Sequence, residues 1–224
     1  MKKIILLGVI VMASLVTFSI FSKTKENTTI NSVTKTNGSK TLIVYFSRVG
    51  NTNLGKQVDS VASASIIVDK NDVLGNNELV SKMIQKITGG DIFPIVGKNP
   101  YPLDYDKVVY QASEELDSEA FPPLKDKVKN INKYDTVFIV VPIWWGTFPR
   151  PVFTFLKEND LSNKQVILFI THKGSNFGRS FNDLKKSAPN STVIKGLGIP
   201  AYSLDDLKDS ENDIEKWLKE NGII

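Results

Sequence analysis

The chain has 224 residues, of which 41% are hydrophobic and 23% charged, values typical of a globular protein with a full core. It contains no cysteine and a single histidine, His172, which excludes disulfides, thiolate catalysis, iron–sulfur clusters, cysteine-linked lipid anchors and multi-His metal sites. The formal net charge of +4 comes from residues 1–39, which hold five lysines and one glutamate. Residues 40–224 have 23 basic and 23 acidic side chains and are therefore neutral. This neutrality argues against a nucleic-acid partner.

The N-terminus carries a membrane-targeting pattern. Lys2 and Lys3 precede the uncharged, largely apolar run Ile4–Ser22, which is close to the length that spans a bilayer. A cleavable signal peptide has a shorter apolar stretch and a small-x-small site, for which this run has only weak candidates. We expect residues 1–22 to be an uncleaved anchor that places the domain outside the cytoplasm, with secretion after cleavage as the alternative. Residues 23–40, rich in small and polar side chains, are expected to form a flexible tether.

Apolar runs alternate with amphipathic segments along residues 41–224. Strands are expected at 41–46, 91–96, 136–141, 166–171 and 192–197, and helices at 78–88, 104–118, 149–159, 176–187 and 207–221. The third and fourth strands lack polar alternation and are expected to be central, whereas Pro94 predicts that the second lies at an edge. The alternation predicts a parallel, doubly wound α/β sheet, in which ligands bind beyond the carboxyl ends of the strands.

The first expected strand is followed by a phosphate-loop pattern, Ser47-Arg48-Val49-Gly50-Asn51-Thr52. Gly50 lets the backbone approach an anion closely, and successive backbone N–H groups can converge on one phosphate. Ser47, Asn51 and Thr52 add short side-chain donors. The same residues also suit an ordinary polar turn, so the pattern alone does not decide between the two.

Two other loops at the same edge of the sheet carry unusual residues. The loop after the third strand contains Trp144 and Trp145, and two adjacent indoles cannot both face one core, so one is expected to cover a planar ligand. The loop that starts at Thr171 can offer backbone groups to the polar edge of a heterocycle. For His172, a histidine bonded to the backbone is as good an interpretation as an acid–base role.

These three loops together resemble those of the flavodoxin family, in particular a bacterial flavodoxin-like subgroup with a Trp-Trp loop. The resemblance extends from residue 41 to about residue 220 and includes Asn99–Pro102 and Pro122–Leu124. It implies a five-stranded parallel sheet in the order 2-1-3-4-5 with helices on both faces, and FMN bound without covalent attachment. It places the FMN phosphate on Ser47, Arg48, Val49, Gly50, Asn51 and Thr52. It places the isoalloxazine ring between two loops, which contribute Pro142, Ile143, Trp144, Trp145 and Gly146, and Thr171, His172, Gly174, Ser175 and Gly178.

One departure from the family pattern is an insertion at about residues 53–77. In ordinary flavodoxins the phosphate loop runs directly into a helix, whose N-terminus supplies donors and a partial positive charge. Here a second helix-start signal, Gly75-Asn76-Asn77-Glu78, follows the insertion. The hypothesis is that the insertion folds over the phosphate side and returns Asn76 and Asn77 to the cofactor. The alternative is a surface excursion, with the first loop binding phosphate alone.

The resemblance implies a redox protein and leaves two functions open. One is electron transfer between redox proteins, although this neutral domain lacks the acidic charge of typical soluble flavodoxin carriers. The other is an NAD(P)H- or partner-dependent FMN reductase of quinones or similar acceptors. A receiver-type signalling domain would need an aspartate where Pro142 and Ile143 stand, and a nucleotide P-loop would need Gly-Lys-Ser/Thr. We expect redox partner proteins, no nucleic acid, and membrane attachment through the N-terminal segment.

Overall fold

The computed structural model describes residues 40–54, 65–69 and 72–224, all of which belong to the unit Asn31–Ile224. The expected anchor (1–22), all but the last residue of the expected tether (23–40) and part of the insertion lie outside the described residues. Within the described ranges, no helix combines the length and the apolar character that crossing a membrane requires.

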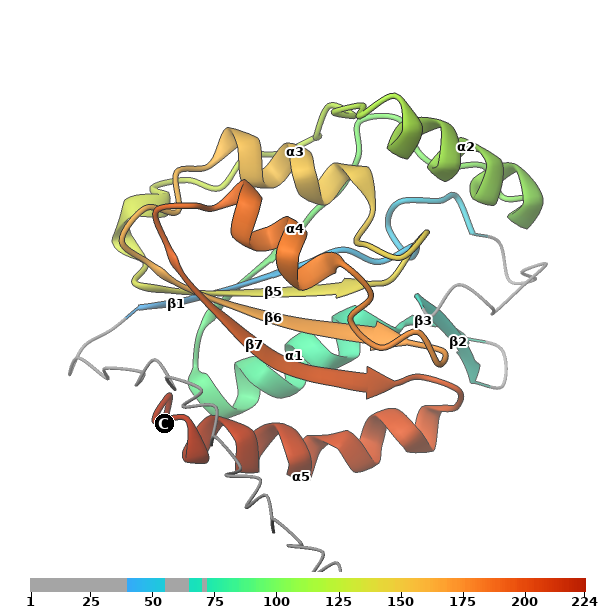
Figure 1. Ribbon diagram of the computed structural model, residues 1–224. Helices are drawn as coiled ribbons and strands as arrows, with labels where there is room; N and C mark the ends of the chain where they lie inside the picture. Colours follow the sequence, from blue (N-terminus) through green and yellow to red (C-terminus); the bar gives the residue numbers. More distant parts are fainter. Residues whose placement is uncertain (1–39, 55–64, 70–71) are drawn as a thin grey trace, which may run out of the picture. The chain divides into compact units, whose positions relative to one another are not determined.

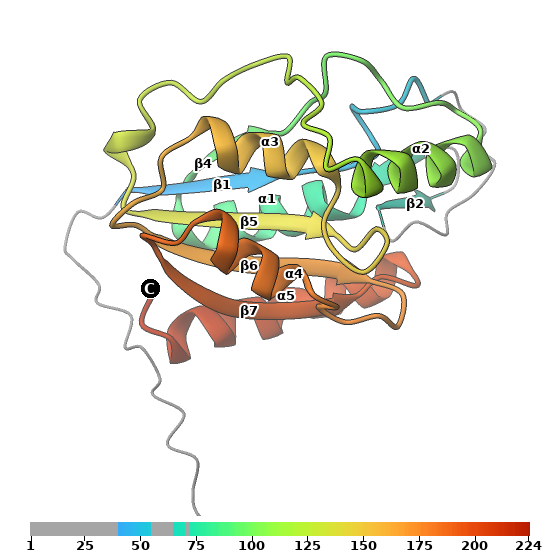
Figure 2. The ribbon, with the colours of Figure 1, turned by 45° about the horizontal axis from the view of Figure 1, so that its top comes forward.

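A five-stranded parallel sheet lies at the centre, in the order β4-β1-β5-β6-β7 (Figures 1 and 2). Its strands are β1 (Thr41–Tyr45), β4 (Asp91–Pro94), β5 (Thr136–Pro142), β6 (Gln165–His172) and β7 (Thr192–Pro200). Counted among these five strands alone, the order is 2-1-3-4-5, so the predicted order and the parallel α/β class are confirmed. The strand that contains Pro94 lies at an edge, as predicted.

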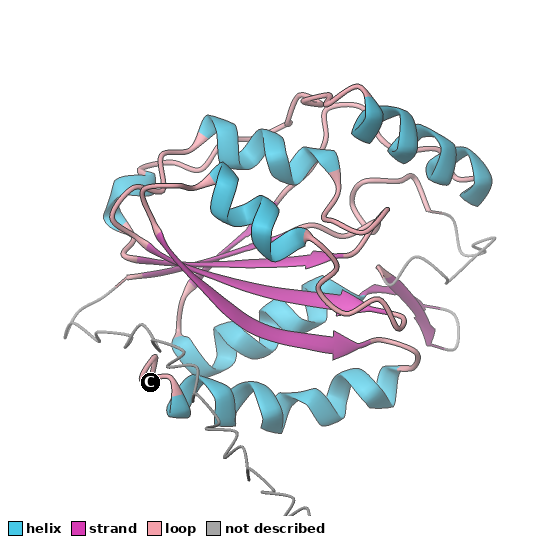
Figure 3. Cartoon of the chain, in the orientation of Figure 1, coloured by secondary structure: helices cyan, strands magenta, loops and turns pink. Residues whose placement is uncertain are grey.

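Helices cover both faces of the sheet (Figures 1 and 3). On one face lie α1 (Asn76–Thr88) and α5 (Leu204–Glu220), and on the other lie α3 (Arg150–Glu158) and α4 (Ser180–Ser187). The remaining helix, α2 (Tyr105–Asp117), contacts α3, and a short 3-10 helix, η1 (Ile131–Lys133), precedes β5. The arrangement is the three-layer, doubly wound one that the alternation of strands and helices predicted.

Two hydrophobic cores, one on each face, hold the layers together. Side chains of β5 alternate between them: Val137, Ile139 and Val141 face the α3 and α4 side, while Phe138 and Val140 face α1 and α5. Every residue of β5 is buried, and β6 is buried except at its first residue. These two strands are therefore central and covered on both faces, as their sequences predicted.

Two helices begin three or four residues away from the predicted position, each for a local reason. Helix α4 begins at Ser180 rather than at Asn176, because Asn176 has a φ of 48°, which a right-handed helix cannot contain. Helix α5 begins at Leu204, three residues earlier than predicted, because Ser203 caps it by accepting the backbone N–H of Asp206.

The described part of the insertion contains an antiparallel hairpin, β2 (Ile66–Asp69) and β3 (Asp72–Gly75). The hairpin lies beyond the carboxyl ends of the sheet strands (Figures 1 and 2). Its last residue, Gly75, pairs with Ile66 and is also the N-cap of α1. The second helix-start signal is thus confirmed, with the first helical residue at Asn76.

Candidate functional site

Three loops meet at the carboxyl edge of the sheet, where the chain leaves β1, β5 and β6 (Figure 1). The strand order reverses at β1, since the chain continues from β1 to β4 on one side and to β5 on the other. Such a reversal opens a crevice for a ligand in doubly wound sheets. The structure therefore brings together the three loops that the sequence singled out.

The loop after β1 is fixed by Asn51, whose side-chain amide is fully used inside the protein. Its Nδ2 donates to the carbonyl oxygens of Ser47 and Ile95, both at 2.8 Å, and its Oδ1 accepts the Gly97 N–H at 2.7 Å. Gly50, at the exposed tip, has a φ of 87°. We expected Asn51 to donate to a phosphate; in the structure it instead ties the loop to the segment after β4.

Arg48 also differs from its expected role. Its side chain is completely buried, and Nη2 donates to the Leu103 carbonyl oxygen at 2.5 Å. The guanidinium carbon lies 5.8 Å from the centre of the Tyr105 ring. The charge that was expected to help hold a phosphate is therefore directed to the segment before α2.

The start of α1 lies directly against this loop. A Cβ on Gly75 would come within 2.6 Å of the Ser47 Oγ, so only glycine permits this approach. Ser65 links the two sides: its Oγ accepts the Arg48 N–H at 2.7 Å, and its carbonyl oxygen accepts from Ser47 Oγ (3.2 Å) and Asn76 N (3.1 Å). The insertion thus returns the helix start to the first loop; that Asn76 and Asn77 meet the cofactor stays a prediction.

Several buried polar atoms at this junction lack a hydrogen-bond partner in the described part of the chain. They are both side-chain amide atoms of Asn76, Nδ2 of Asn77, and the hydroxyls of Thr52 and Ser81. Buried polar groups are nearly always paired, and an unpaired one costs about 1–3 kcal/mol. Because Gly75 offers no capping side chain, the positive end of the α1 dipole is also available to an anion.

Asn77 connects the helix start to the end of β6. Its Oδ1 accepts from the Thr171 hydroxyl at 3.0 Å, and both side chains are buried. Ile143, after β5, donates its N–H to the Thr171 carbonyl oxygen at 3.3 Å. Asn77 and Thr171 therefore join the first loop, α1 and the loop after β5 into one continuous site.

The two tryptophans separate, as predicted. Trp144 is buried and packs edge-on against Phe46 and Tyr101, at centroid distances of 5.4 and 5.3 Å, so its side chain belongs to the core. Trp145 is 52% exposed, and its indole Nε1 donates to the Val109 carbonyl oxygen of α2 at 3.0 Å. The indole of Trp145 can accordingly contact a ligand. Trp144 can contact a ligand only through its backbone.

Trp145 occupies an unfavourable backbone conformation. The N–H and C=O of Trp144 and Thr147 bond to each other, and the two residues between them, Trp145 and Gly146, have φ values of 51° and 79°. A left-handed conformation costs a residue with a side chain about 1–2 kcal/mol. Strained residues of this kind gather at functional sites, where the surroundings hold them in place.

The loops after β5 and β6 are in direct contact. Arg179 donates its N–H to the Gly146 carbonyl oxygen at 2.8 Å, and a Cβ on Gly178 would overlap that same oxygen. On α4, Asp183 accepts from the Thr147 hydroxyl at 2.7 Å and from Arg179 Nε at 3.2 Å. The two loops that were expected to flank a flavin ring are thus held as a pair.

His172 bonds to the backbone of the loop that follows β6. Burial lowers the pKa of its imidazole below the ordinary value of 6.5, against a smaller opposing effect of a backbone hydrogen bond with Gly198. Its Nδ1 accepts the Gly174 N–H at 3.1 Å. A histidine bonded to the backbone, one of the two interpretations of the sequence, is what the structure shows.

The expected site residues fall into buried, half-buried and exposed groups. The buried ones are Ser47, Arg48, Asn51, Thr52, Asn76, Asn77, Pro142, Trp144, Thr171 and His172; Val49 and Ile143 are half-buried; and Gly50, Trp145, Gly146, Gly174, Ser175 and Gly178 are exposed. Sequence analysis missed Ser65, Ser81 and Asp183. The small-residue run that ends at Ser65, which holds three serines within six positions, was the available signal for the first of these.

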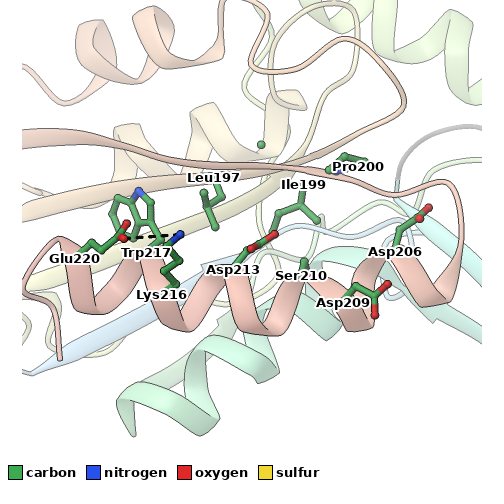
Figure 4. Close-up of a pocket in the computed structure, with 11 residues that line it drawn as sticks. Leu197, Ile199, Pro200, Asp206, Asp209, Ser210, Asp213, Lys216, Trp217 and Glu220 are labelled. Carbon is green, nitrogen blue, oxygen red and sulfur yellow. Dashed lines mark ion pairs between the residues drawn. The ribbon is translucent and has the colours of Figure 1, made fainter.

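A groove of about 450 Å³ lies elsewhere, between β7 and α5 (Figure 4). Its acidic side chains, Asp206, Asp209, Asp213 and Glu220, belong to α5, and the Trp217 ring packs edge-on against Phe169. None of the expected site residues lines this groove, so it is separate from the three loops.

Comparisons with known proteins agree with this geometry. A family model described as flavodoxin matches residues 65–221. A candidate flavoprotein from Bacteroides eggerthii is 29% identical, with 82% of this chain and 98% of that chain covered and a TM-score of 0.61. Another from Bacteroides uniformis is 25% identical (82% and 99% covered, TM-score 0.60). A Lactobacillus acidophilus flavoprotein crystallised with FMN has the same fold at 22% identity (80% and 98% covered, TM-score 0.54). A search of the curated proteins found no match.

We expect His172 to titrate below pH 6.5 and to make the free energy of unfolding depend on pH. Because the folded-state pKa is lowered, the unfolded chain binds the proton first. The stability that neutral His172 contributes is therefore present above pH 6.5 and is lost as the pH falls through the folded-state pKa. NMR of the single histidine measures the pKa, and urea unfolding between pH 5 and 8 measures stability. His172→Gln should flatten this pH dependence; an unchanged slope would contradict the assignment.

Gly178→Ala should destabilise the protein more than Gly89→Ala. Both glycines have positive φ, 50° and 70°, so each substitution carries a similar backbone penalty of about 1 kcal/mol. Only at Gly178 does the new Cβ also overlap the Gly146 oxygen, whereas nothing lies within 4 Å at Gly89. Urea unfolding of both variants gives the comparison, and equal losses would show that the two loops are not held in contact here.

Proposed function

Because the chain belongs to the flavodoxin family, we propose that its domain binds FMN without covalent attachment and mediates electron transfer. The phosphate would bind at the junction of the first loop with the start of α1, and the isoalloxazine ring would lie against Trp145 and the loop from Thr171 to Gly178. Bound FMN supplies one- and two-electron redox chemistry; the residues of this chain bind it, orient it and limit its contact with water.

The observation that carries the proposal is the uncapped start of α1 with its unpaired amides. Asn76 and Asn77 are buried and hold unused side-chain N–H groups beside the loop of Ser47. Donors in that number and the positive end of a helix dipole match a phosphate dianion. The residues present therefore fit the phosphate of FMN. These residues would bind the phosphate mainly through hydrogen-bond donors and the helix dipole, because the Arg48 side chain donates to Leu103.

The ring side is supported by the contact between the two loops. Trp145 presents a flat apolar surface, and its hydrogen bond to Val109 together with the Gly146–Gly178 contact fixes its position. An indole fixed in this way can stack on a planar ring without losing further side-chain freedom. Burial lowers the pKa of His172, which disfavours a positive charge next to the ring.

The specific role divides into a carrier and a reductase. Residues 40–224 carry no net charge, so electrostatic steering toward a basic redox partner is weak. The reductase is therefore kept as the alternative function. In that alternative the domain would reduce quinones or similar acceptors with electrons from NAD(P)H or a protein partner. For a carrier, the partners would be redox proteins that meet the exposed rim of the site.

Attachment to a membrane through residues 1–22 is part of the proposal and rests on the sequence alone. It would place the domain outside the cytoplasm, with secretion after cleavage as the alternative. Cell fractionation combined with N-terminal mass measurement separates the two.

The double variant Asn76→Ala and Asn77→Ala should weaken FMN binding by about 100-fold or more and should lower the stability of the ligand-free protein only slightly. Hydrogen bonds to a charged group contribute about 1.5–3 kcal/mol each, whereas the ligand-free protein loses only the bond from the Thr171 hydroxyl to Asn77 Oδ1, about 1 kcal/mol. Fluorescence titration measures affinity. Riboflavin, which lacks the phosphate, should bind the variant and the wild type equally.

Asn51→Ala is the matched control for that experiment. Its amide makes three hydrogen bonds to the backbone, so its loss should lower the free energy of unfolding by several kcal/mol. If the Asn76 and Asn77 variant lost stability like Asn51→Ala and kept its affinity for FMN, the proposed phosphate site would be wrong.

Anaerobic reduction separates the carrier from the reductase. A carrier should take up electrons from dithionite in two resolved one-electron steps, followed by its visible spectrum, and should not be reduced by NADH or NADPH alone. Rapid bleaching by either nucleotide with turnover of a quinone would establish the reductase instead. A chain that remains colourless after FMN is added would remove both.

A further inference from the structure

We propose that Ser65 is a further residue of the phosphate site, which ties the first loop to the start of α1 and donates a hydrogen bond from its hydroxyl to the phosphate. This inference rests on the proposed binding of FMN. Ser65 stands outside the six-residue loop and outside the helix-start signal, and it is completely buried.

The first argument is the position of Ser65. Ser65 precedes β2, and the pairing of Ile66 with Gly75 sets it opposite Asn76. Its carbonyl oxygen accepts the Asn76 N–H, so Ser65 bonds directly to the first helical residue. The hairpin fixes Ser65 at the helix start, so its atoms lie where the phosphate is proposed to bind.

The second argument is the use of its polar atoms. The Ser65 carbonyl oxygen accepts two hydrogen bonds, from Ser47 Oγ and Asn76 N, which occupies both of its lone pairs. It therefore presents no bare acceptor to an anion. The Ser65 Oγ accepts from the Arg48 N–H at 2.7 Å, but no acceptor for its own proton is found among the described residues.

The chemistry follows from this division of roles. A hydroxyl that accepts from a backbone N–H becomes a better donor, because chained hydrogen bonds polarise one another. Its proton is then suited to an anionic oxygen, as are the unused N–H groups of Asn76 and Asn77. Ser65 joins the two sides of the cradle through Ser47 and Asn76 and adds one donor of its own.

The contrary possibility is that the Ser65 hydroxyl occupies the acceptor position at the Arg48 N–H and competes with the phosphate for it. In that case removing the hydroxyl would free the Arg48 N–H and tighten FMN binding. The two possibilities predict opposite changes in affinity, so one substitution distinguishes them.

The test is Ser65→Ala in the full-length chain, with FMN and riboflavin titrated in parallel. We expect FMN to bind about 10-fold more weakly or worse, because a charge-assisted hydrogen bond is lost, and riboflavin to bind as in the wild type. Ser210→Ala is the matched control, since Ser210 is a buried serine of α5 whose hydroxyl donates to the Leu207 carbonyl oxygen away from the site. It should leave both affinities unchanged.

Equal or tighter FMN binding by Ser65→Ala, with the wild type binding FMN, would overturn the inference and leave the proposed function standing. Failure of the wild type to bind FMN would remove both. Should Ser65→Ala not fold, NMR of the wild type decides: the amide signals of Arg48, Ser65 and Asn76 should differ between the FMN and riboflavin complexes. Identical signals in the two complexes would overturn the inference.

Discussion

The close contact between Ser47 and Gly75 is the constraint on which the rest of the site depends. The insertion separates the first loop from α1 along the chain, and only a helix start brought back to the loop can present its dipole there. The contact requires a residue without a Cβ at position 75 and an acceptor at Ser65 for the donors on both sides. The hairpin formed by β2 and β3 satisfies both requirements, because its final residue is also the helix cap.

The opposite side of the site depends on a second close contact, between Gly146 and Gly178. Each of these glycines ends a turn with positive φ, and the carbonyl oxygen of the first bonds to the backbone just after the second. Asp183 then ties both loops to α4. The strained conformation of Trp145 is sustained by this framework, which is how an exposed indole keeps a single position at the edge of the sheet.

Periodicity predicted the sheet well, because hydrophobic burial on two faces leaves a strong local signal in strands such as β5. The run Gly75-Asn76-Asn77-Glu78 predicted a helix start, which the structure places at Asn76. Neither pattern predicted the roles of Asn51 and Arg48, because their partners, Ile95, Gly97 and Leu103, lie more than 40 residues away. The direction of a polar side chain depends on such long-range contacts, which no local pattern contains.

The same limit explains the tryptophans. The sequence showed that two adjacent indoles must diverge, but the choice between them depends on Phe46 and Tyr101, which form the surface that Trp144 packs against. It also explains Ser65, whose importance comes from β3 folding back beside it. The residues that chemistry alone identifies are those whose neighbours in the sequence are also their neighbours in space.

The unpaired groups at the start of α1 connect binding to stability. Each buried polar atom without a partner costs the folded state about 1–3 kcal/mol, and an anion that accepts from the N–H and O–H donors among them removes their share of that cost. A ligand that binds only the folded state stabilises it further as its concentration rises above the dissociation constant. In the proposed site, the donors that weaken the ligand-free domain would thus be the ones that give a phosphate its affinity. A chain with Asn76, Asn77 and Ser81 buried in this way is better suited to the bound state than to the free one.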